Sequence, residues 1–254
     1  MIEAFSLFSG SSGNGTLVRS GGTSILIDAG RSRRAVGCAL TAVGQCAADL
    51  AGIFITHEHT DHIGALDQLC KHEGVPVHAS CGTADALLHH DFVRGNLVRH
   101  PVIYTETVGS LTVTAFPLPH DSACHVGYIV RDEDGDAICI ATDMGHICEN
   151  LLTALAGCRG ALIEANHDIA MLRCGPYPAY LKARILSPVG HLSNEDCARV
   201  AAHAESVGVK FLALGHLSEE NNTPKLARDT VAAALGGADT VLTVCDRCAP
   251  TRIM

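Results

Sequence analysis

The sequence predicts an α/β protein built as a four-layer αβ/βα sandwich, with two sheets inside and helices outside. Short β-branched and aromatic runs alternate with Ala- and Leu-rich periodic stretches in both halves of the chain, a pattern typical of strands interleaved with helices. Two such sets predict two sheets packed face to face, with helices covering their outer faces. No Pro/Ser-rich stretch or run of charge separates the halves, so we expect a single domain over residues 1–254.

The predicted strands are short apolar or alternating runs that end in a turn or in polar residues. Strands are predicted over residues 5–8, 16–19, 24–27, 53–55, 75–79, 111–116, 126–130, 137–141, 161–164, 210–214 and 240–244, with an extended segment over 97–106. Helices are predicted over residues 32–48, 63–73, 82–90, 148–156, 194–207 and 223–235. Gly74 is placed to stop the second helix, and Ser193 is placed to cap the fifth. Gly175 and Pro178 predict a loop over residues 170–191.

The composition limits the classes of partner. The 254 residues carry 18 Lys plus Arg against 27 Asp plus Glu, a formal net charge of −9, so binding of nucleic acid needs a local basic patch. With no Trp, six Phe and four Tyr, an extended platform for stacking bases is not expected. The twelve cysteines are irregularly spaced, and the chain shows no signal peptide or membrane span, so we expect a cytoplasmic protein with reduced thiols. Cys245 and Cys248 form a lone CxxC, which we expect to pack rather than to bind metal.

The stretch that carries the chemistry is the heptapeptide THEHTDH, residues 56–62. Its four candidate metal ligands, His57, His59, Asp61 and His62, directly follow the apolar run 53–55. Imidazole and carboxylate groups are the ligands that zinc and similar divalent metals prefer. A His-rich surface loop would explain any one of these residues, but not four of them at the end of a buried strand.

Polar residues follow four further strands, at positions 120–121, 143, 166–168 and 216. Because strands that run in the same direction bring their ends to one edge of a layered fold, we expect these segments and the stretch 57–62 to form one site. A lone His at a strand end is usually structural, but five such ends favour a metal site. Asp28 ends the strand 24–27 and is expected to orient the metal loop from outside the ligand set.

The run HEHTDH after an apolar strand resembles the HxHxDH signature of the metallo-β-lactamase-fold hydrolases. Further similarity lies in the segments SGSSGN (residues 9–14), LIDAG (26–30), TDMG (142–145), EANHD (164–168), GHLSN (190–194) and HLSEENN (216–222). Together these segments resemble the WalJ (YycJ)-type branch of that superfamily. The resemblance implies the four-layer fold and a site for two divalent metal ions, zinc or manganese.

The resemblance also implies a division of the ligands between the two metals. The expected ligands are His57, His59 and His120 for one metal, Asp61, His62 and His216 for the other, and Asp143 as the bridge. Two cations close together need a shared anion between them, which suits a bridging carboxylate. His125 and His100 compete for the role given to His120. We prefer His120 because it closely follows the strand 111–116 and is paired with Asp121.

The expected reaction is hydrolysis of a phosphodiester, in which a water between the metals loses a proton and attacks phosphorus. Asp61 and Asp143 are the catalytic carboxylates expected among the ligands. His191 and His167 are candidates to contact the phosphate or to protonate the leaving oxygen, since neither completes a ligand set. A structural hydrogen-bonding role is open for each of these two histidines.

The resemblance further implies a metal-dependent 5′→3′ exonuclease that acts on DNA. Candidates for a basic rim and for stacking on a terminal base are Arg31, Arg33, Arg34, Lys182, Arg184, Tyr177 and Tyr180. Solvated loop charges and tyrosines packed on prolines would explain the same residues equally well.

Two other functions are consistent with the sequence. A phosphodiesterase for cyclic phosphates or cyclic nucleotides would use the same ligands, and the net charge of −9 suits a small substrate. A catalytically silent metal-binding protein is the alternative from a different class, and the complete ligand set argues against it. The His/Asp ligands do not distinguish zinc from manganese, because both metals accept them.

Overall fold

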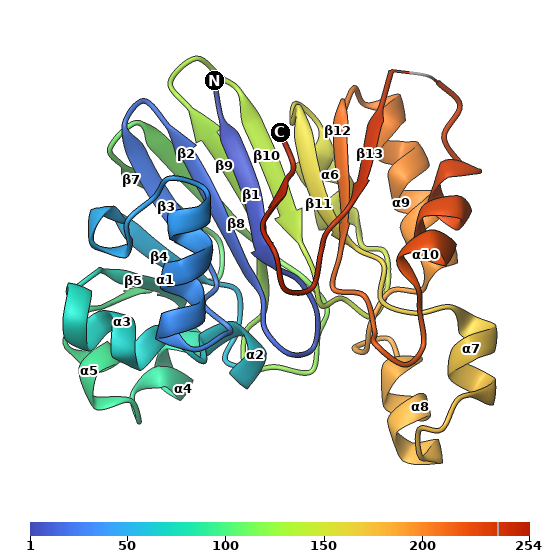
Figure 1. The fold of residues 1–254 in the computed structure, drawn as a ribbon, viewed down its shortest axis with the longest axis horizontal. Coiled ribbons are helices and arrows are strands. Elements are labelled where there is room, and N and C mark those ends of the chain that lie inside the picture. Colours follow the sequence, from blue (N-terminus) through green and yellow to red (C-terminus); the bar gives the residue numbers. More distant parts are fainter. Residues whose placement is uncertain (238) are drawn as a thin grey trace.

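The structure is a computed structural model that describes residues 1–237 and 239–254. Within these residues the strands form two seven-stranded sheets (Figure 1). The first sheet has the order β14 (Thr251–Arg252), β1 (Glu3–Phe8), β2 (Gly15–Ser20), β3 (Thr23–Ile27), β4 (Gly52–Ile55), β5 (Val77–Ser80) and β6 (Leu97–His100). The second has the order β13 (Val241–Val244), β12 (Phe211–Gly215), β11 (Gly160–Glu164), β10 (Ala137–Ala141), β9 (Val126–Asp132), β8 (Leu111–Pro117) and β7 (Tyr104–Val108).

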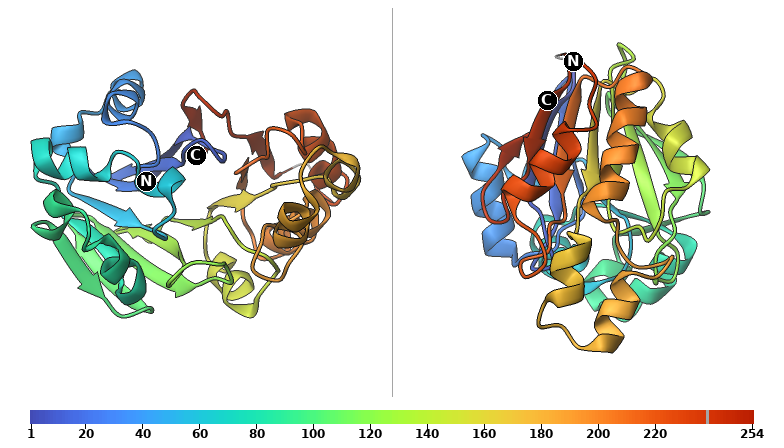
Figure 2. Two further views of the ribbon diagram at one scale, coloured as in Figure 1. Left: turned by 90° about the horizontal axis from the view of Figure 1, so that it is seen from below. Right: turned by 90° about the vertical axis from the view of Figure 1, so that its right-hand side faces the viewer.

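Helices cover the outer face of each sheet. Residues of α1 (Arg33–Ala42), α3 (Leu66–Glu73) and α4 (Cys81–Leu87) pack on the first sheet, and residues of α6 (Glu149–Leu155), α9 (Asn194–Ser206) and α10 (Pro224–Ala232) pack on the second. Shorter elements are a 3₁₀ turn (Ala47–Asp49), α2 (Thr60–Ile63), α5 (Asp91–Arg94), α7 (Ile169–Cys174) and α8 (Ala179–Ile185). The view from below shows helices, sheet, sheet and helices in turn (Figure 2). The predicted four-layer αβ/βα sandwich is confirmed.

The core between the two sheets fixes their relative position. It is built from fully buried side chains of both sheets, among them Ile25 and Phe54 from the first and Tyr128 and Ile138 from the second. The hydroxyl of Tyr128 donates to the carbonyl oxygen of Ile55 at 2.8 Å, directly before the metal loop. The middle of the second sheet is therefore tied to the strand that delivers the central histidines.

Strand direction determines where the polar strand ends lie. Strands β3 to β6 run parallel, and so do β10 to β13. Strand β8 is antiparallel to β9, which is antiparallel to β10, so β8 runs in the direction of β10. The carboxyl ends of these strands therefore meet at one edge of the sandwich, the edge with α2 in Figure 1.

Two sequence expectations are wrong in detail, and one short strand is not predicted. The segment 170–191 contains α7 and α8 rather than a loop, because Asp168 caps α7 by accepting from the amide of Met171 and Pro178 precedes the first turn of α8. The extended segment 97–106 divides into β6 and β7, which belong to different sheets. Strand β14 has only two residues, too few for a period to show in the sequence.

Residues from both ends of the chain, including Ile2 and Met254, lie in the core between the sheets. This shared core supports the single domain expected over residues 1–254, which stays a prediction. In the part of the chain that the structure describes, no helix combines the length and the apolar character needed to cross a membrane.

We predict that Gly30→Ala destabilises the protein by about 1–3 kcal/mol, because overpacking against backbone is costly. Gly30 follows β3, and a Cβ there would overlap the carbonyl oxygen of Asp61 in the metal loop. Gly37→Ala is the matched control, since a Cβ at Gly37 within α1 meets no atom within 4 Å. Replacing glycine by alanine inside a helix should stabilise by about 0.5–1 kcal/mol. Urea unfolding of both variants measures the difference, and an unchanged midpoint for Gly30→Ala would contradict the close approach.

Candidate metal centre

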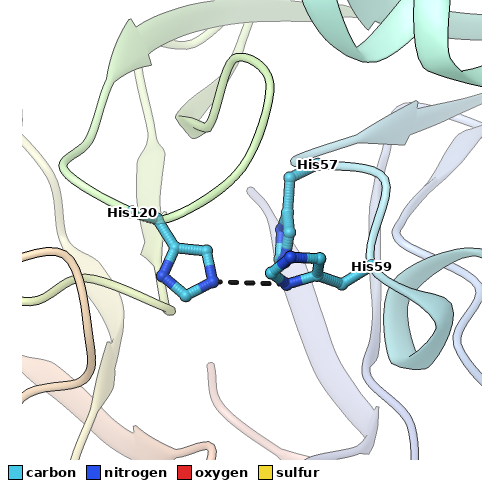
Figure 3. Close-up of side chains that lie close together, drawn as sticks. All are labelled: His57, His59 and His120. Atoms are coloured by element: carbon cyan, nitrogen blue, oxygen red, sulfur yellow. Dashed lines mark hydrogen bonds between the residues drawn. The ribbon is translucent and has the colours of Figure 1, made fainter. Parts of the chain in front are cut away.

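Three histidines form the first part of the centre. His57 and His59 follow β4, and His120 follows β8 (Figure 3). Their ligand atoms lie within 4.8 Å of one another, and Nε2 of His120 is 3.3 Å from Nδ1 of His59. Two nitrogens at about 2.0–2.1 Å from one tetrahedral zinc stand roughly 3.3 Å apart. The spacing of these histidines therefore fits a shared metal ion.

The second part of the centre combines carboxylates and imidazoles from both sheets. Nε2 of His62 lies 3.5 Å from Oδ2 of Asp61 and 3.4 Å from Oδ2 of Asp143. Nε2 of His216, at the end of β12, lies 3.6 Å from Oδ2 of Asp61 and 3.3 Å from Oδ1 of Asp143. Asp143 also groups with His57 and His62, so it lies between the two parts. The structure brings together all seven side chains that the sequence nominated as ligands.

Several atoms at the focus of this centre are buried without a partner. Nε2 of His57, Oδ2 of Asp143 and Nε2 of His216 accept or donate no hydrogen bond among the described residues. Buried polar atoms are normally paired, because an unpaired one loses its solvation without compensation. All three belong to groups of potential ligands that converge at the strand ends. The donor set thus fits divalent cations, whose binding would satisfy these atoms.

The first sheet fixes its ligands through Asp28. Nδ1 of His62 donates to Oδ2 of Asp28 at 2.8 Å, so Nε2 faces the centre. Oδ1 of Asp28 accepts from the amide of Thr56 at 2.8 Å, and Oδ2 accepts from its hydroxyl at 2.9 Å. The same hydroxyl lies 3.0 Å from Nδ1 of His57. Asp28 therefore orients the metal loop from outside the ligand set, as the sequence predicts.

The second sheet fixes its ligand through Glu164, a role that the sequence analysis missed. This fully buried carboxylate ends β11, and its Oε1 accepts from Nδ1 of His216 at 2.7 Å and from Nδ1 of His191 at 2.8 Å. Oε2 accepts from the amides of Met144 and Leu192, each at 3.0 Å. The signal available in the sequence was a glutamate at the end of an otherwise apolar strand.

Backbone carbonyl groups orient the ring of His120. Nδ1 of His120 donates to the carbonyl oxygens of Val189 and Gly190, at 3.1 and 3.2 Å. His125 instead donates from Nε2 to the carbonyl of Thr142, and His100 pairs with His78 on β5. The structure therefore brings His120, rather than His125 or His100, to the first part of the centre.

The backbone is left-handed at three strand ends that serve the centre. Asp28, Asp143 and His216 have φ angles of 61°, 59° and 54°. Non-glycine residues seldom adopt this conformation, and such strain concentrates at functional sites. Asp143 and His216 belong to the ligand cluster and Asp28 holds His62, so all three left-handed residues take part in building the centre.

Burial and charge set the protonation of the centre. Burial, reinforced by the neighbouring His62, holds the pKa of His57 well below its usual range. Burial also opposes the charge on His62, but the carboxylates of Asp143 and Asp28 outweigh it and raise the pKa of His62. Burial opposes ionisation of Asp61, yet the imidazoles of His216 and His62 outweigh it and lower the pKa of Asp61. Burial likewise opposes ionisation of Asp143, but His216 and His62 outweigh it and lower the pKa of its carboxyl. Asp61 and Asp143 are therefore ionised and need positive charge close by.

A cavity of about 260 Å³ opens onto the centre. It is lined by Ser11, His59, Asp61, Asp143, Asn166, Tyr177, Leu181, Arg184, Ile185, His191, His216 and Ser218. Five of these residues belong to the segment 169–191, which contains α7 and α8 and which we name the α7–α8 arm. The arm projects at the same end of the sandwich as α2 (Figure 1). His191 lines the cavity, whereas His167 is buried outside its lining, where burial lowers the pKa to about 4.

The other candidates for substrate contact are dispersed. Tyr177 and Arg184 line the cavity, and Tyr180 is 76% exposed on the arm. Arg33 and Arg34 line a separate groove along α1, and Arg33 forms an ion pair with Glu73 there. The basic rim is therefore smaller than expected. A larger groove of about 990 Å³ near the chain termini shares no residue with the centre, so chemistry rather than size identifies the site.

The cysteines take no part in the centre. All twelve are free, and Cys245 is buried while Cys248 is exposed with its Sγ 3.6 Å from Nη2 of Arg31.

Comparison with known proteins places this arrangement in a family. A model of the beta-lactamase superfamily domain matches residues 23–216. The chain belongs to the beta-lactamase superfamily. Exodeoxyribonuclease WalJ of Streptococcus pneumoniae (strain D39) is 34% identical over 245 residues, which cover 92% of this chain and 88% of that protein. Exodeoxyribonuclease YycJ of Bacillus anthracis is 35% identical over 234 residues, which cover 90% and 87%. The resemblance to the WalJ (YycJ)-type branch is confirmed.

Solved structures agree on the fold. The metallo-beta-lactamase fold protein YhfI from Bacillus subtilis superposes with a TM-score of 0.76 at 15% identity, over 99% of each chain. The short form of human tRNase Z superposes with a TM-score of 0.69 at 20% identity, over 100% of each chain. Superfamily membership and the His/Asp clusters together make this chain a metal-dependent hydrolase with a site for divalent metal ions.

We predict that Glu164→Gln weakens metal binding by about 10- to 100-fold, since partners of metal ligands commonly contribute that much. Four donors face the Glu164 carboxylate, so the amide nitrogen of a glutamine would confront donors and leave them unpaired. Competition with a chromophoric zinc chelator measures the affinity. Glu133→Gln, which removes the same charge from an exposed turn, is the control. Equal affinities of the two variants would contradict a role of Glu164 in orienting His216.

Proposed function

We propose that this protein is a two-metal phosphodiesterase that degrades DNA from the 5′ end. The observation that carries this proposal is the convergence of unpartnered, buried ligand atoms from both sheets at one edge of the sandwich. The outer nitrogens of His62 and His216 are held by Asp28 and Glu164, so these ligands are already oriented. A preformed cluster of this kind suits catalysis, which needs ligands in place before the substrate arrives.

In this proposal the ligands divide as the family resemblance implies. One metal would be held by His57, His59 and His120, the other by Asp61, His62 and His216, with Asp143 between them. The position of Asp143 in groups with His57 and His62 and with His216 supports a bridging role. Zinc or manganese held there would supply Lewis-acid activation of water and of the phosphoryl oxygens.

The proton donor that we propose is His191. Its Nδ1 donates to Glu164, which leaves Nε2 as the nitrogen available to a phosphodiester in the cavity. Burial opposes the ionisation of Glu164, but the imidazoles of His191 and His216 outweigh it and keep the pKa of this carboxyl well below its usual range. The Glu164 carboxylate thus fixes the ring of His191, so that Nε2 would be the nitrogen that passes a proton to the leaving oxygen. His167 does not line the cavity, so we assign it a packing role.

DNA as the substrate rests on two supports. The curated relatives are named exodeoxyribonucleases and match most of the chain. The α7–α8 arm also brings Tyr177 and Arg184 to the cavity, where they offer a stacking surface and a positive charge. A small-molecule phosphodiesterase is the second candidate, and the modest cavity volume of about 260 Å³ favours it.

We predict that the purified protein, supplied with manganese or zinc, shortens 5′- and 3′-end-labelled duplex DNA one nucleotide at a time from the 5′ end. Asp61→Ala should abolish this activity, because the variant loses a ligand at the second metal position. Gel analysis of both labels fixes the polarity. No degradation by a fully metal-loaded protein would favour the small-molecule phosphodiesterase instead.

We predict that His191→Ala lowers kcat by about 10²- to 10⁴-fold, the range that general acid catalysis contributes. Its metal content should stay at the wild-type level, since His191 lies outside the proposed ligand sets. Elemental analysis alongside DNA digestion separates the two effects. Loss of bound metal in this variant would rule out the assignment of His191 as proton donor.

A further inference from the structure

The α7–α8 arm places one cation beside the metal centre. Arg184, on α8, is the only Lys or Arg among the described residues that line the cavity. The arm contains Arg173, Lys182 and Arg184 but no Asp or Glu, in a chain whose net charge is −9. The cavity is therefore lined by metal ligands together with one guanidinium.

In the structure this guanidinium is paired with Asp121. Nε and Nη2 of Arg184 donate to the two carboxylate oxygens, with 3.0 Å between Nη2 and Oδ1. A phosphate presents two oxygens to the same planar fork of donors. The side chains of Arg184 and Asp121 are 46% and 28% exposed, and ion pairs open to solvent contribute little to stability. Exchange of Asp121 for another anion therefore costs little.

The distance from the guanidinium to the metal centre is set by the fold. Oδ1 of Asp121 lies 3.4 Å from Nε2 of His120, the nitrogen that faces His59. The arm is tied to the same side, because the carbonyl of Val189 accepts from the amide of Asp121 at 3.2 Å and Nδ1 of His191 donates to Glu164 at 2.8 Å. Arg184 thus stands one carboxylate away from the ligand cluster.

The cavity that Arg184 shares with the metal ligands is small. Its volume of about 260 Å³ is below the roughly 300–1,000 Å³ of pockets that enclose a drug-sized molecule, so we expect no more than about one nucleotide of a strand inside it. Tyr177, Leu181 and Ile185 line it beside Arg184, so the arm forms much of its wall. A strand whose scissile phosphate lies at the metal centre would place its terminal nucleotide against the arm.

We propose that Arg184 is a specificity-determining residue that binds the 5′-terminal phosphate of the DNA strand. Arg184 exchanges Asp121 for this phosphate, and the phosphodiester on the other side of the terminal nucleotide then lies at the metal centre. This inference rests on the proposed exonuclease function and adds a requirement for a phosphorylated end.

The test compares KM and kcat for one oligonucleotide bearing either a 5′-phosphate or a 5′-hydroxyl. The wild-type protein should show a KM at least about tenfold lower for the phosphorylated end, as expected for a charge-assisted hydrogen bond. In Arg184→Gln the two KM values should converge, and in Arg184→Lys, which keeps the charge but not the fork, the preference should be intermediate. Arg173→Gln removes the same charge from the arm outside the cavity lining and should keep the wild-type preference.

Two results would overturn the role of Arg184 while leaving the exonuclease function intact. One is an Arg184→Gln variant whose KM values and preference for the 5′-phosphate match those of the wild type. The other is an Arg184→Gln variant whose KM rises by the same factor for both ends, so that the preference is kept. If the wild-type protein hydrolyses bis(4-nitrophenyl) phosphate but neither oligonucleotide, the exonuclease function itself fails, and the inference fails with it.

Discussion

The metal centre depends on two buried carboxylates that are not themselves in the proposed ligand sets. Asp28 holds the outer nitrogen of His62 in the first sheet, and Glu164 holds the outer nitrogen of His216 in the second. Each carboxylate ends a parallel strand and also accepts backbone amides, so ligand orientation is built into the ends of the sheets. Without such acceptors, an imidazole can rotate about its side-chain bonds and present either nitrogen.

The sandwich explains why these two anchors face each other. Parallel strands in each sheet bring their carboxyl ends to one edge, and the core between the sheets fixes the two edges against one another. Neither sheet alone supplies a complete centre, because Asp61 and His62 come from the first and Asp143 and His216 from the second. The geometry of the ligand cluster is therefore a property of how the sheets pack, and Tyr128, which bonds across to Ile55, contributes to it.

Much of the fold and the ligand cluster was readable from the sequence, because both depend on local patterns. The run from His57 to His62 contains four candidate metal ligands, and apolar periodicity revealed most strands and helices.

Glu164 was missed because its function lies in the direction of its hydrogen bonds, which strand periodicity does not encode. The arm helices were missed because Gly175 and Pro178 are typical of loops, while the cap of α7 depends on the direction of the Asp168 side chain. Which arginines reach the cavity depends on tertiary packing, so Arg33 and Arg184 were indistinguishable in the sequence.

At Asp28, Asp143 and His216 the left-handed backbone lowers the stability of the fold, while the side chains at the same positions build the metal centre. Glycine tolerates this backbone conformation without strain, so glycine at these positions would relieve the strain while removing the functional side chain. A directed-evolution campaign that selects only for heat resistance would therefore tend to enrich variants at these sites that are more robust but inert. Any thermostable descendant of this protein should be chosen by turnover and melting temperature together.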